Sequence, residues 1–182
     1  MKSIEKYESV IKADAATINK YRGIVPDELL AVWEEYGFGY MLNGYLRVIN
    51  PDDYKALVRE TYFRGDISIP IFTTAFGDVI NWEEGRYIRM VKYKNGTFHG
   101  MAAGFKFFFP DLEDEEFVKE FLEIEQYEAA LQLLPMPKLD ECYGYTPLLA
   151  LGGSEKVENL RVVKIKEHIH LISQVIGMVG AD

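Results

Sequence analysis

Apolar residues recur at helical spacing in several segments of the chain. The clearest segment spans residues 25–37, where Pro26 opens the first turn, two acidic residues follow it, and Gly37 can adopt the left-handed conformation that ends a helix. Its apolar stripe consists of Leu29, Leu30, Trp33 and Tyr36. A second helix is predicted over residues 50–65, opened by an asparagine that can cap it. The pattern at residues 3–12 predicts a short helix that leads into a linker.

Helical spacing returns in the last part of the chain. After Pro110, acidic residues suited to a first helical turn precede a predicted buried face. That face consists of Phe117, Val118, Phe121 and Leu122. A further helix carries Tyr127 and Leu131 and ends before Pro135, which cannot continue it. Isoleucines at offsets of 4, 7 and 11 across residues 165–176 predict a terminal helix with one apolar face.

Between these helical regions, β-branched and aromatic residues form short runs that turn residues separate. A first run, residues 45–49, predicts a strand. Later runs lie at residues 69–75, 79–82, 87–93, 97–101 and 105–109. The Asn95-Gly96 pair between two of them is typical of a two-residue hairpin turn. Short strands are also predicted within residues 148–153, together with a glycine turn, and near Val162.

These elements predict an α+β fold in which helices flank a central antiparallel meander. We expect an N-terminal helical region, residues 1–66, and a sheet-containing C-terminal region, residues 67–182, packed together as one unit. The chain has ample material for such a core, because 48% of its residues are hydrophobic and 14% are aromatic.

The net charge of −9 bears on the choice of partner. An acidic surface repels nucleic acid and anionic lipid, and it speeds encounter with a positively charged protein. Nucleases are such proteins, because they carry basic clefts that hold phosphates. Solubility alone is the other interpretation of the same charge. No apolar stretch approaches the ~18 residues of a membrane span, and the N-terminus lacks the apolar core of a signal peptide, so we expect a cytoplasmic protein.

Few residues suggest chemistry. Cys142 is the only cysteine, which excludes an internal disulfide, and it is more typical of a buried structural residue than of a nucleophile. His168 and His170 fall about 200° apart on the predicted helix and are poorly placed to chelate a metal. The segment from Gly152 to Lys156 lacks the spacing of a phosphate loop and favours a tight turn. We therefore expect no catalytic residue, cofactor or metal.

Acidic clusters supply the candidate partner-binding residues. Helix starts or solvated helix faces explain most clusters taken singly, so only their collective charge suggests a function. The candidates are Glu34, Glu35, Glu83, Glu84, Asp111, Glu113, Asp114, Glu115 and Glu116. Four aromatic residues among acidic neighbours could anchor an interface or equally belong to the core, namely Tyr40, Tyr45, Tyr87 and Tyr93.

Several motifs, taken together, resemble known families over roughly residues 21–177. Those that resemble the GAD-like domain include Tyr21-Arg22-Gly23, Val25-Pro26-Asp27-Glu28-Leu29-Leu30, Trp33-Glu34-Glu35-Tyr36-Gly37 and Ala75-Phe76-Gly77-Asp78. Those that resemble the C-terminal domain of the type VI secretion DNase-immunity family include Leu139-Asp140-Glu141-Cys142-Tyr143-Gly144-Tyr145-Thr146-Pro147 and Leu149-Ala150-Leu151-Gly152-Gly153. These relatives are bacterial immunity proteins, distantly similar to Knr-type regulators of cell-wall synthesis.

The resemblance implies that the protein binds a cognate polymorphic toxin, often a nuclease, by stoichiometric protein–protein contact in the producing cell. It assigns no toxin-contact residue. Two alternatives stay open at this point. One is a non-catalytic regulator or adaptor related to the regulators of cell-wall glucan synthesis, which the identity of the neighbouring gene would distinguish. The other is a hydrolase that uses paired acids, which substitution of those acids would disable.

Overall fold

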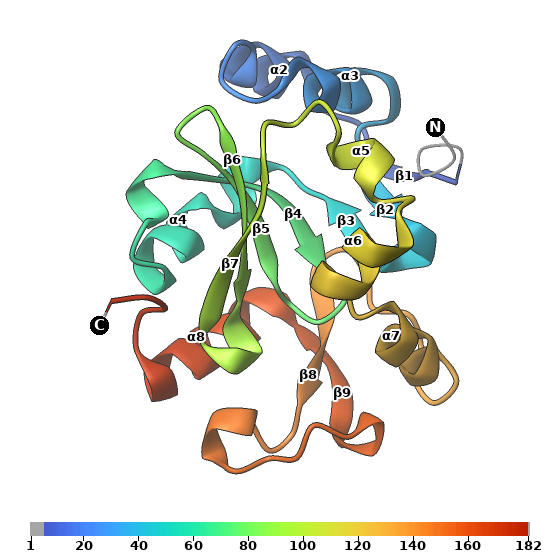
Figure 1. Ribbon diagram of the computed structural model, residues 1–182, viewed down its shortest axis with the longest axis vertical. Helices are drawn as coiled ribbons and strands as arrows, with labels where there is room; N and C mark the ends of the chain where they lie inside the picture. Colours follow the sequence, from blue (N-terminus) through green and yellow to red (C-terminus); the bar gives the residue numbers. More distant parts are fainter. Residues whose placement is uncertain (1–5, 182) are drawn as a thin grey trace.

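A seven-stranded antiparallel sheet forms the centre of the computed structural model, which describes residues 6–181. Its strands are β1 (Glu8–Ile11), β2 (Phe38–Met41), β3 (Leu46–Val48), β4 (Ser68–Thr74), β5 (Val79–Glu83), β6 (Tyr87–Lys92) and β7 (Thr97–Ala103). They lie side by side in chain order, so the sheet is a meander (Figure 1). The predicted α+β class with a central antiparallel meander is confirmed.

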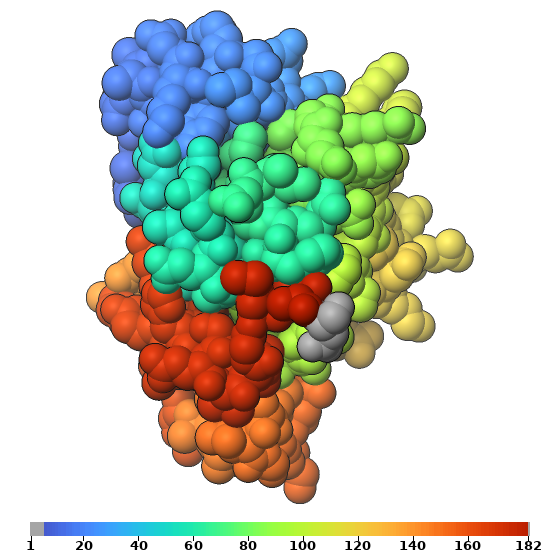
Figure 2. All heavy atoms as spheres, turned by 90° about the vertical axis from the view of Figure 1, so that its left-hand side faces the viewer, coloured from blue at the N-terminus to red at the C-terminus, as the bar shows by residue number. Residues whose placement is uncertain are grey.

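Helices cover both faces of this sheet. Strand β5 alternates between them: Val79 packs in a cluster with α4 (Pro51–Thr61) and α8 (Ile165–Ile176), whereas Ile80 belongs to a larger cluster that includes α2 (Ala15–Tyr21) and α3 (Asp27–Tyr36). Every residue of β5 is buried, as expected for a central strand covered on both sides. Figure 2 shows α4 and α8 side by side on one face, with the N-terminal helices at one end.

The chain after β7 packs along one side and one end of the sheet (Figure 1). It comprises α5 (Phe108–Asp111), α6 (Glu115–Phe121), α7 (Ile124–Leu131), β8 (Glu141–Tyr145), β9 (Leu160–Lys164) and α8. Strands β8 and β9 form a separate antiparallel pair. This pair is joined to the main sheet, because the Tyr143 N–H donates to the Ala75 carbonyl at 2.7 Å, just beyond the end of β4.

Where local signals are strong, the elements follow the sequence. Asn50 caps α4 by accepting a hydrogen bond from the Asp52 N–H at 3.1 Å, with Pro51 in the first turn. Gly37 ends α3 as predicted, at a positive φ of 76°, but its ψ of −145° lies outside the left-handed helical conformation. The predicted β3–β7 strands, β9 and the helices α6, α7 and α8 are likewise present.

Four predictions are wrong in the described residues. Residues 8–11 form an edge strand instead of a helix, because β2, which was not predicted, pairs with them. Residues 93–96 form a four-residue turn instead of the predicted two-residue turn at Asn95-Gly96. Tyr93 and Lys94 are buried and lie outside the strand ladder. Residues 149–151 form a 3-10 turn instead of a strand. The start of the first predicted helix, residues 3–5, lies outside the described residues.

The fourth error concerns residues 105–109, which do not form a strand. Phe105, Phe108 and Phe109 are separated by three and four residues, which is helical spacing, and their rings gather around Phe72 of β4 at centroid distances of 5.3 to 6.4 Å. A turn at Phe105, closed by the Phe108 N–H on the Phe105 carbonyl, leads into the short helix α5, and together they bring these rings to one side. Burial against β4 therefore outweighs the preference of aromatic residues for strands.

The division of the chain at residue 66 stays a prediction. Strands β3 and β4 lie on opposite sides of that position and pair with each other, with Val48 opposite Phe72, so the main sheet runs across it. Within residues 6–181, no helix combines the length and apolar character needed to cross a membrane.

The edge strand β1 provides a test of this packing. A Cβ added at Gly39 would lie 2.1 Å from the Glu8 carbonyl oxygen, whereas one added at Gly100 in β7 meets nothing within 4 Å. We expect Gly39→Ala to lower the free energy of unfolding by about 1–3 kcal/mol and to raise amide exchange in β1, because a backbone clash cannot be relieved by a rotamer change. Gly100→Ala should cost less than about 0.5 kcal/mol in the same urea titrations. Equal losses would contradict this account.

Candidate functional site

Most of the excess negative charge lies in one stretch of the chain, residues 111–128. This stretch contains nine Asp and Glu residues against one lysine, a net charge of −8. The rest of the chain carries the remaining 20 acidic and 19 basic residues, so it is almost neutral. The stretch runs from the end of α5 through α6 into α7, along one side of the molecule (Figure 1). The negative electrostatic field of the protein therefore arises mainly from this side.

A groove of about 530 Å³ lies at α6 and α7 within this stretch. Its lining combines apolar side chains with carboxylates on both helices. The lining residues are Glu115, Val118, Lys119, Leu122, Glu123, Ile124, Glu125 and Gln126. Such a surface can take a ligand that is both apolar and positively charged.

The apolar face of α6 is incompletely covered by the rest of the protein. The sequence predicted a buried face of four residues, but only Leu122, which follows the helix, is buried. Phe117, Val118 and Phe121 are half-buried against the core. The helix itself starts as predicted, because the Asp114 carboxylate accepts a hydrogen bond from the Phe117 N–H at 2.9 Å. The periodicity located the face correctly but overestimated its burial.

The five candidate acids of this stretch differ in their surroundings. Asp114 is the capping residue of α6. Glu115 and Glu116 are exposed in the first turn of that helix, where they also favour its positive end. Glu113 is exposed and Asp111 is half-buried in α5. Their role in binding a partner stays a prediction.

The remaining candidate acids come from other elements. Glu34 and Glu35 are exposed near the end of α3, and Glu34 forms an ion pair with Arg22 at 2.7 Å. Glu84 is exposed in the turn between β5 and β6 and pairs with Arg64 at 2.8 Å. The nine acids therefore come from several elements, and of them only Glu115 lines the groove.

Glu83 does not belong to the acidic surface, which corrects the prediction for this residue. Its side chain is fully buried and lies 2.7 Å from Arg64 and 3.1 Å from Arg89. The Ser68 hydroxyl donates a third contact at 2.9 Å. A carboxylate held in this way stabilises the interior and is not available to a partner. Arg64 and Ser68 lie 19 and 15 residues before Glu83 in the chain, and Arg89 lies on the neighbouring strand β6, so it is the folded sheet that brings the three partners together around Glu83.

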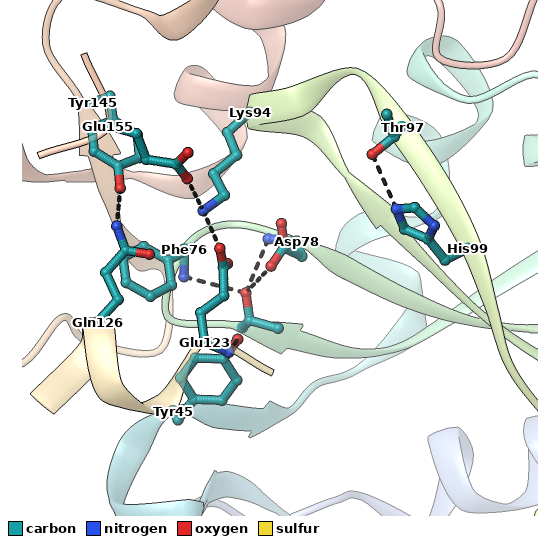
Figure 3. A network of polar contacts seen from close by, with 11 residues as sticks. Tyr45, Phe76, Asp78, Lys94, Thr97, His99, Glu123, Gln126, Tyr145 and Glu155 are labelled. Carbon is teal, nitrogen blue, oxygen red and sulfur yellow. Dashed lines mark hydrogen bonds and ion pairs between the residues drawn. The ribbon is translucent and has the colours of Figure 1, made fainter. Parts of the chain in front are cut away.

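Lys94 connects the main sheet to the region that carries the groove (Figure 3). Its side chain is only 4% exposed, and its ammonium group lies 2.7 Å from Glu123 and 3.1 Å from Glu155. The ammonium also lies 4.8 Å from the centre of the Phe76 ring. Burial lowers the pKa of Lys94, but nearby Asp78 and Glu123 outweigh this effect and raise it. Because Glu123 lines the groove, the same ion pair fixes one wall of it.

Asp78 lies in the same buried network. Its carboxylate accepts a hydrogen bond from the Thr74 hydroxyl at 2.8 Å (Figure 3). Burial, together with the negative charge of Glu123, raises the pKa of Asp78 to about 6, although Lys94 acts in the opposite direction. Asp78 is therefore a buried acid that gains its proton in mildly acidic solution.

The other residues singled out by the sequence serve mainly as scaffold. Tyr40, Tyr45 and Tyr93 are buried, and only Tyr87 of the four candidate anchors is half-buried. Cys142 is buried, and burial raises its pKa to about 12, which keeps the thiol protonated.

The two histidines and the glycine pair also have structural positions. On α8, His168 is buried and His170 is exposed, so the pair points in different directions. Gly152, at a φ of 84°, ends a 3-10 turn, and the Gly153 N–H closes the turn onto the Leu148 carbonyl. Within residues 6–181, no three His, Cys, Asp or Glu side chains gather where they could hold a metal ion.

Comparison with known families agrees with the resemblance seen in the sequence. The chain belongs to the GAD-like domain family, whose model it matches over residues 1–94. Residues 102–176 match the model described as T6SS immunity protein Tdi1, C-terminal. The resemblance to a GAD-like domain followed by a type VI secretion immunity domain is thus confirmed. The boundary between the two matches lies between residues 94 and 102.

A solved structure has the same fold. The crystal structure of Atu4351 from Agrobacterium tumefaciens matches with a TM-score of 0.76 at 20% identity, over 94% of this chain and 86% of that one. At this identity the likeness concerns the fold alone. No curated protein matches the chain.

We expect the ion pairs of Lys94 to stabilise the fold because the Lys94 side chain is buried. Lys164, an exposed lysine that also pairs with two carboxylates, provides the control. Lys164 also contacts two carboxylates, Asp140 at 2.6 Å and Glu141 at 3.2 Å, but its side chain is 49% exposed. We expect Lys94→Met to lower the free energy of unfolding by about 2–4 kcal/mol, because it removes a buried ammonium that pairs with half-buried Glu123 and lies near the fully buried carboxyl group of Asp78. Lys164→Met should cost less than about 1 kcal/mol. Urea denaturation at pH 7 measures both, and similar values would refute the distinction.

Asp78 predicts a pH dependence of stability. Its folded pKa of about 6 lies above the ordinary value of 3.8, so the folded protein binds this proton more tightly than the unfolded chain. The contribution of Asp78 to stability is therefore largest below pH 4 and declines as the pH rises to about 6. Across this window, we expect wild type to lose on the order of 2–3 kcal/mol relative to Asp78→Asn. Urea midpoints measured from pH 4 to 7 check this, and parallel profiles would contradict it.

Proposed function

We propose that this protein is a bacterial immunity protein that binds a cognate toxin and neutralises it by stoichiometric contact. The supporting observation is that residues 102–176 match the C-terminal domain of an immunity protein, T6SS immunity protein Tdi1. That segment also contains the groove at α6 and α7 and the whole of the acidic stretch. The family match and the concentration of charge thus coincide in one part of the chain.

We propose further that the toxin is basic and is a nuclease. A nuclease holds phosphates with positive charge, and a partner carrying a net charge of −8 on one side is complementary to it. Complementary fields accelerate encounter, which matters when a toxin must be captured before it acts. An interface of about 1,600 Å² would suffice for tight binding. Inhibition of this kind requires no turnover, so we propose a non-catalytic protein that acts in the cytoplasm of the toxin-producing cell.

Co-expression with the toxin domain encoded by the neighbouring gene tests this function. We expect cells that express the toxin domain alone to die and cells that also express this protein to survive. Purified together, the two should form a complex of fixed stoichiometry. A toxin domain from an unrelated system is the control, and it should kill whether or not this protein is present. Survival equal to that with an empty vector would refute the immunity function.

Salt provides a second readout in the same system. We expect the association rate constant to fall about 10–100-fold between 50 and 500 mM NaCl, because the field that steers the partners is screened. The dissociation rate constant should change much less. Stopped-flow fluorescence measures both rates. A salt-independent association rate would contradict the basic character proposed for the partner.

A further inference from the structure

The groove at α6 and α7 has two properties that together define an occupant. The first is unfinished burial: α6 contains no fully buried side chain, although Phe117, Val118 and Phe121 share its inner side. When a partner covers half-buried apolar side chains beside a groove, apolar surface is removed from water, and this contributes favourably to the free energy of binding. Val118 lines the groove directly, together with Ile124.

The second property is the charge around this apolar lining. Glu115 and Glu125 are exposed and belong to different helices that border the groove. Both lie in the first turn of their helix. An occupant must therefore present apolar atoms to the lining and positive charge toward carboxylates from two helices. Lys119 is the one basic residue of the acidic stretch and also lines the groove.

The groove is held in place before any partner binds. The Glu123 carboxylate pairs with buried Lys94 at 2.7 Å, and the Glu123 N–H donates to the Tyr45 hydroxyl at 3.0 Å. Glu123 immediately precedes α7, so these contacts fix the start of that helix relative to the sheet. The Gln126 side chain donates in addition to the Tyr145 hydroxyl. A preformed groove loses little conformational entropy on binding.

We propose that this groove binds a basic amphipathic helix of the cognate toxin. The apolar side chains of that helix cover Val118 and Ile124, and its flanking lysine or arginine side chains pair with Glu115 and Glu125. An amphipathic helix in an apolar groove is a recurrent mode of recognition. The inference rests on the proposed function, since it names the part of the toxin that the acidic side contacts.

Two charge-reversal variants of the full chain separate the groove from the general field. The groove variant is Glu115→Lys/Glu125→Lys, and the control is Asp27→Lys/Glu28→Lys in the first turn of α3. The two variants change the net charge equally, and both replace exposed acids in first helical turns. At 100 mM salt, we expect the groove variant to raise the Kd for the toxin domain about 100-fold and the control less than about 10-fold. Thermal unfolding confirms that both variants fold.

An uncharged variant tests the apolar part of the site. Val118→Ser keeps every charge and alters a side chain that is only half-buried. We expect it to raise the Kd about 10-fold at both low and high salt, because lost apolar contact is not screened. An unchanged Kd would overturn the amphipathic character of the proposed occupant.

A crosslink identifies the occupant directly. Cys142 is buried, so a cysteine introduced by Lys119→Cys is the accessible thiol to which a photoreactive probe can be attached. In the complex, we expect this probe to label a Lys- and Arg-rich helical segment of the toxin domain. The same probe attached through Asp27→Cys should not label that segment. Labelling of an acidic segment, or of a second copy of this chain, would overturn the proposal.

The outcomes distinguish the groove from the function itself. If wild type neither binds nor protects against the toxin, the proposed function fails. If wild type binds and protects but the two charge-reversal variants weaken binding equally, the function stands and the groove proposal is wrong. Selective weakening by the groove variant, with a crosslink to a basic helix, supports both.

Discussion

The ion pairs of buried Lys94 connect the seven-stranded sheet to the region of the chain after β7. Lys94 lies in the turn between β6 and β7, whereas Glu123 precedes α7 and Glu155 lies between β8 and β9. Burying an ammonium group is costly unless carboxylates pair with it, so the sheet and the C-terminal region stabilise each other at this point. Because Glu123 also lines the groove, the contact between Lys94 and Glu123 orients the surface proposed to bind the toxin.

Local signals predicted the parts of the fold that local chemistry determines. The caps of α4 and α6 and the apolar stripes of α3 and α8 lie where the sequence indicates. Strand β1 could not be predicted in this way, because its residues are exposed and only pairing with β2 makes them a strand. The aromatic run before Asp111 was misassigned for the related reason that its conformation depends on rings reaching Phe72, more than thirty residues earlier in the chain.

The candidate site also has a part that the sequence predicts and a part that depends on tertiary packing. The acidic stretch is visible in the sequence, but the groove depends on how α6 and α7 pack, which periodicity does not give. Glu83 shows the opposite case. Together with Glu84 it resembles a solvated acidic pair, yet Arg64 and Arg89 enclose it in the interior. Charge read from sequence alone counts carboxylates and does not tell which of them a partner can reach.

The distribution of charge argues for recognition over solubility alone. A charge that serves only solubility can be spread over the whole surface, where it prevents association most evenly. Here the chain outside residues 111–128 is almost neutral, and the negative charge is concentrated beside half-covered apolar side chains. Apolar contact supplies affinity and charge supplies speed and selection among partners, so their coincidence at α6 and α7 favours a protein ligand. Dispersing the same carboxylates elsewhere would preserve solubility and remove the complementarity on which toxin capture is proposed to depend.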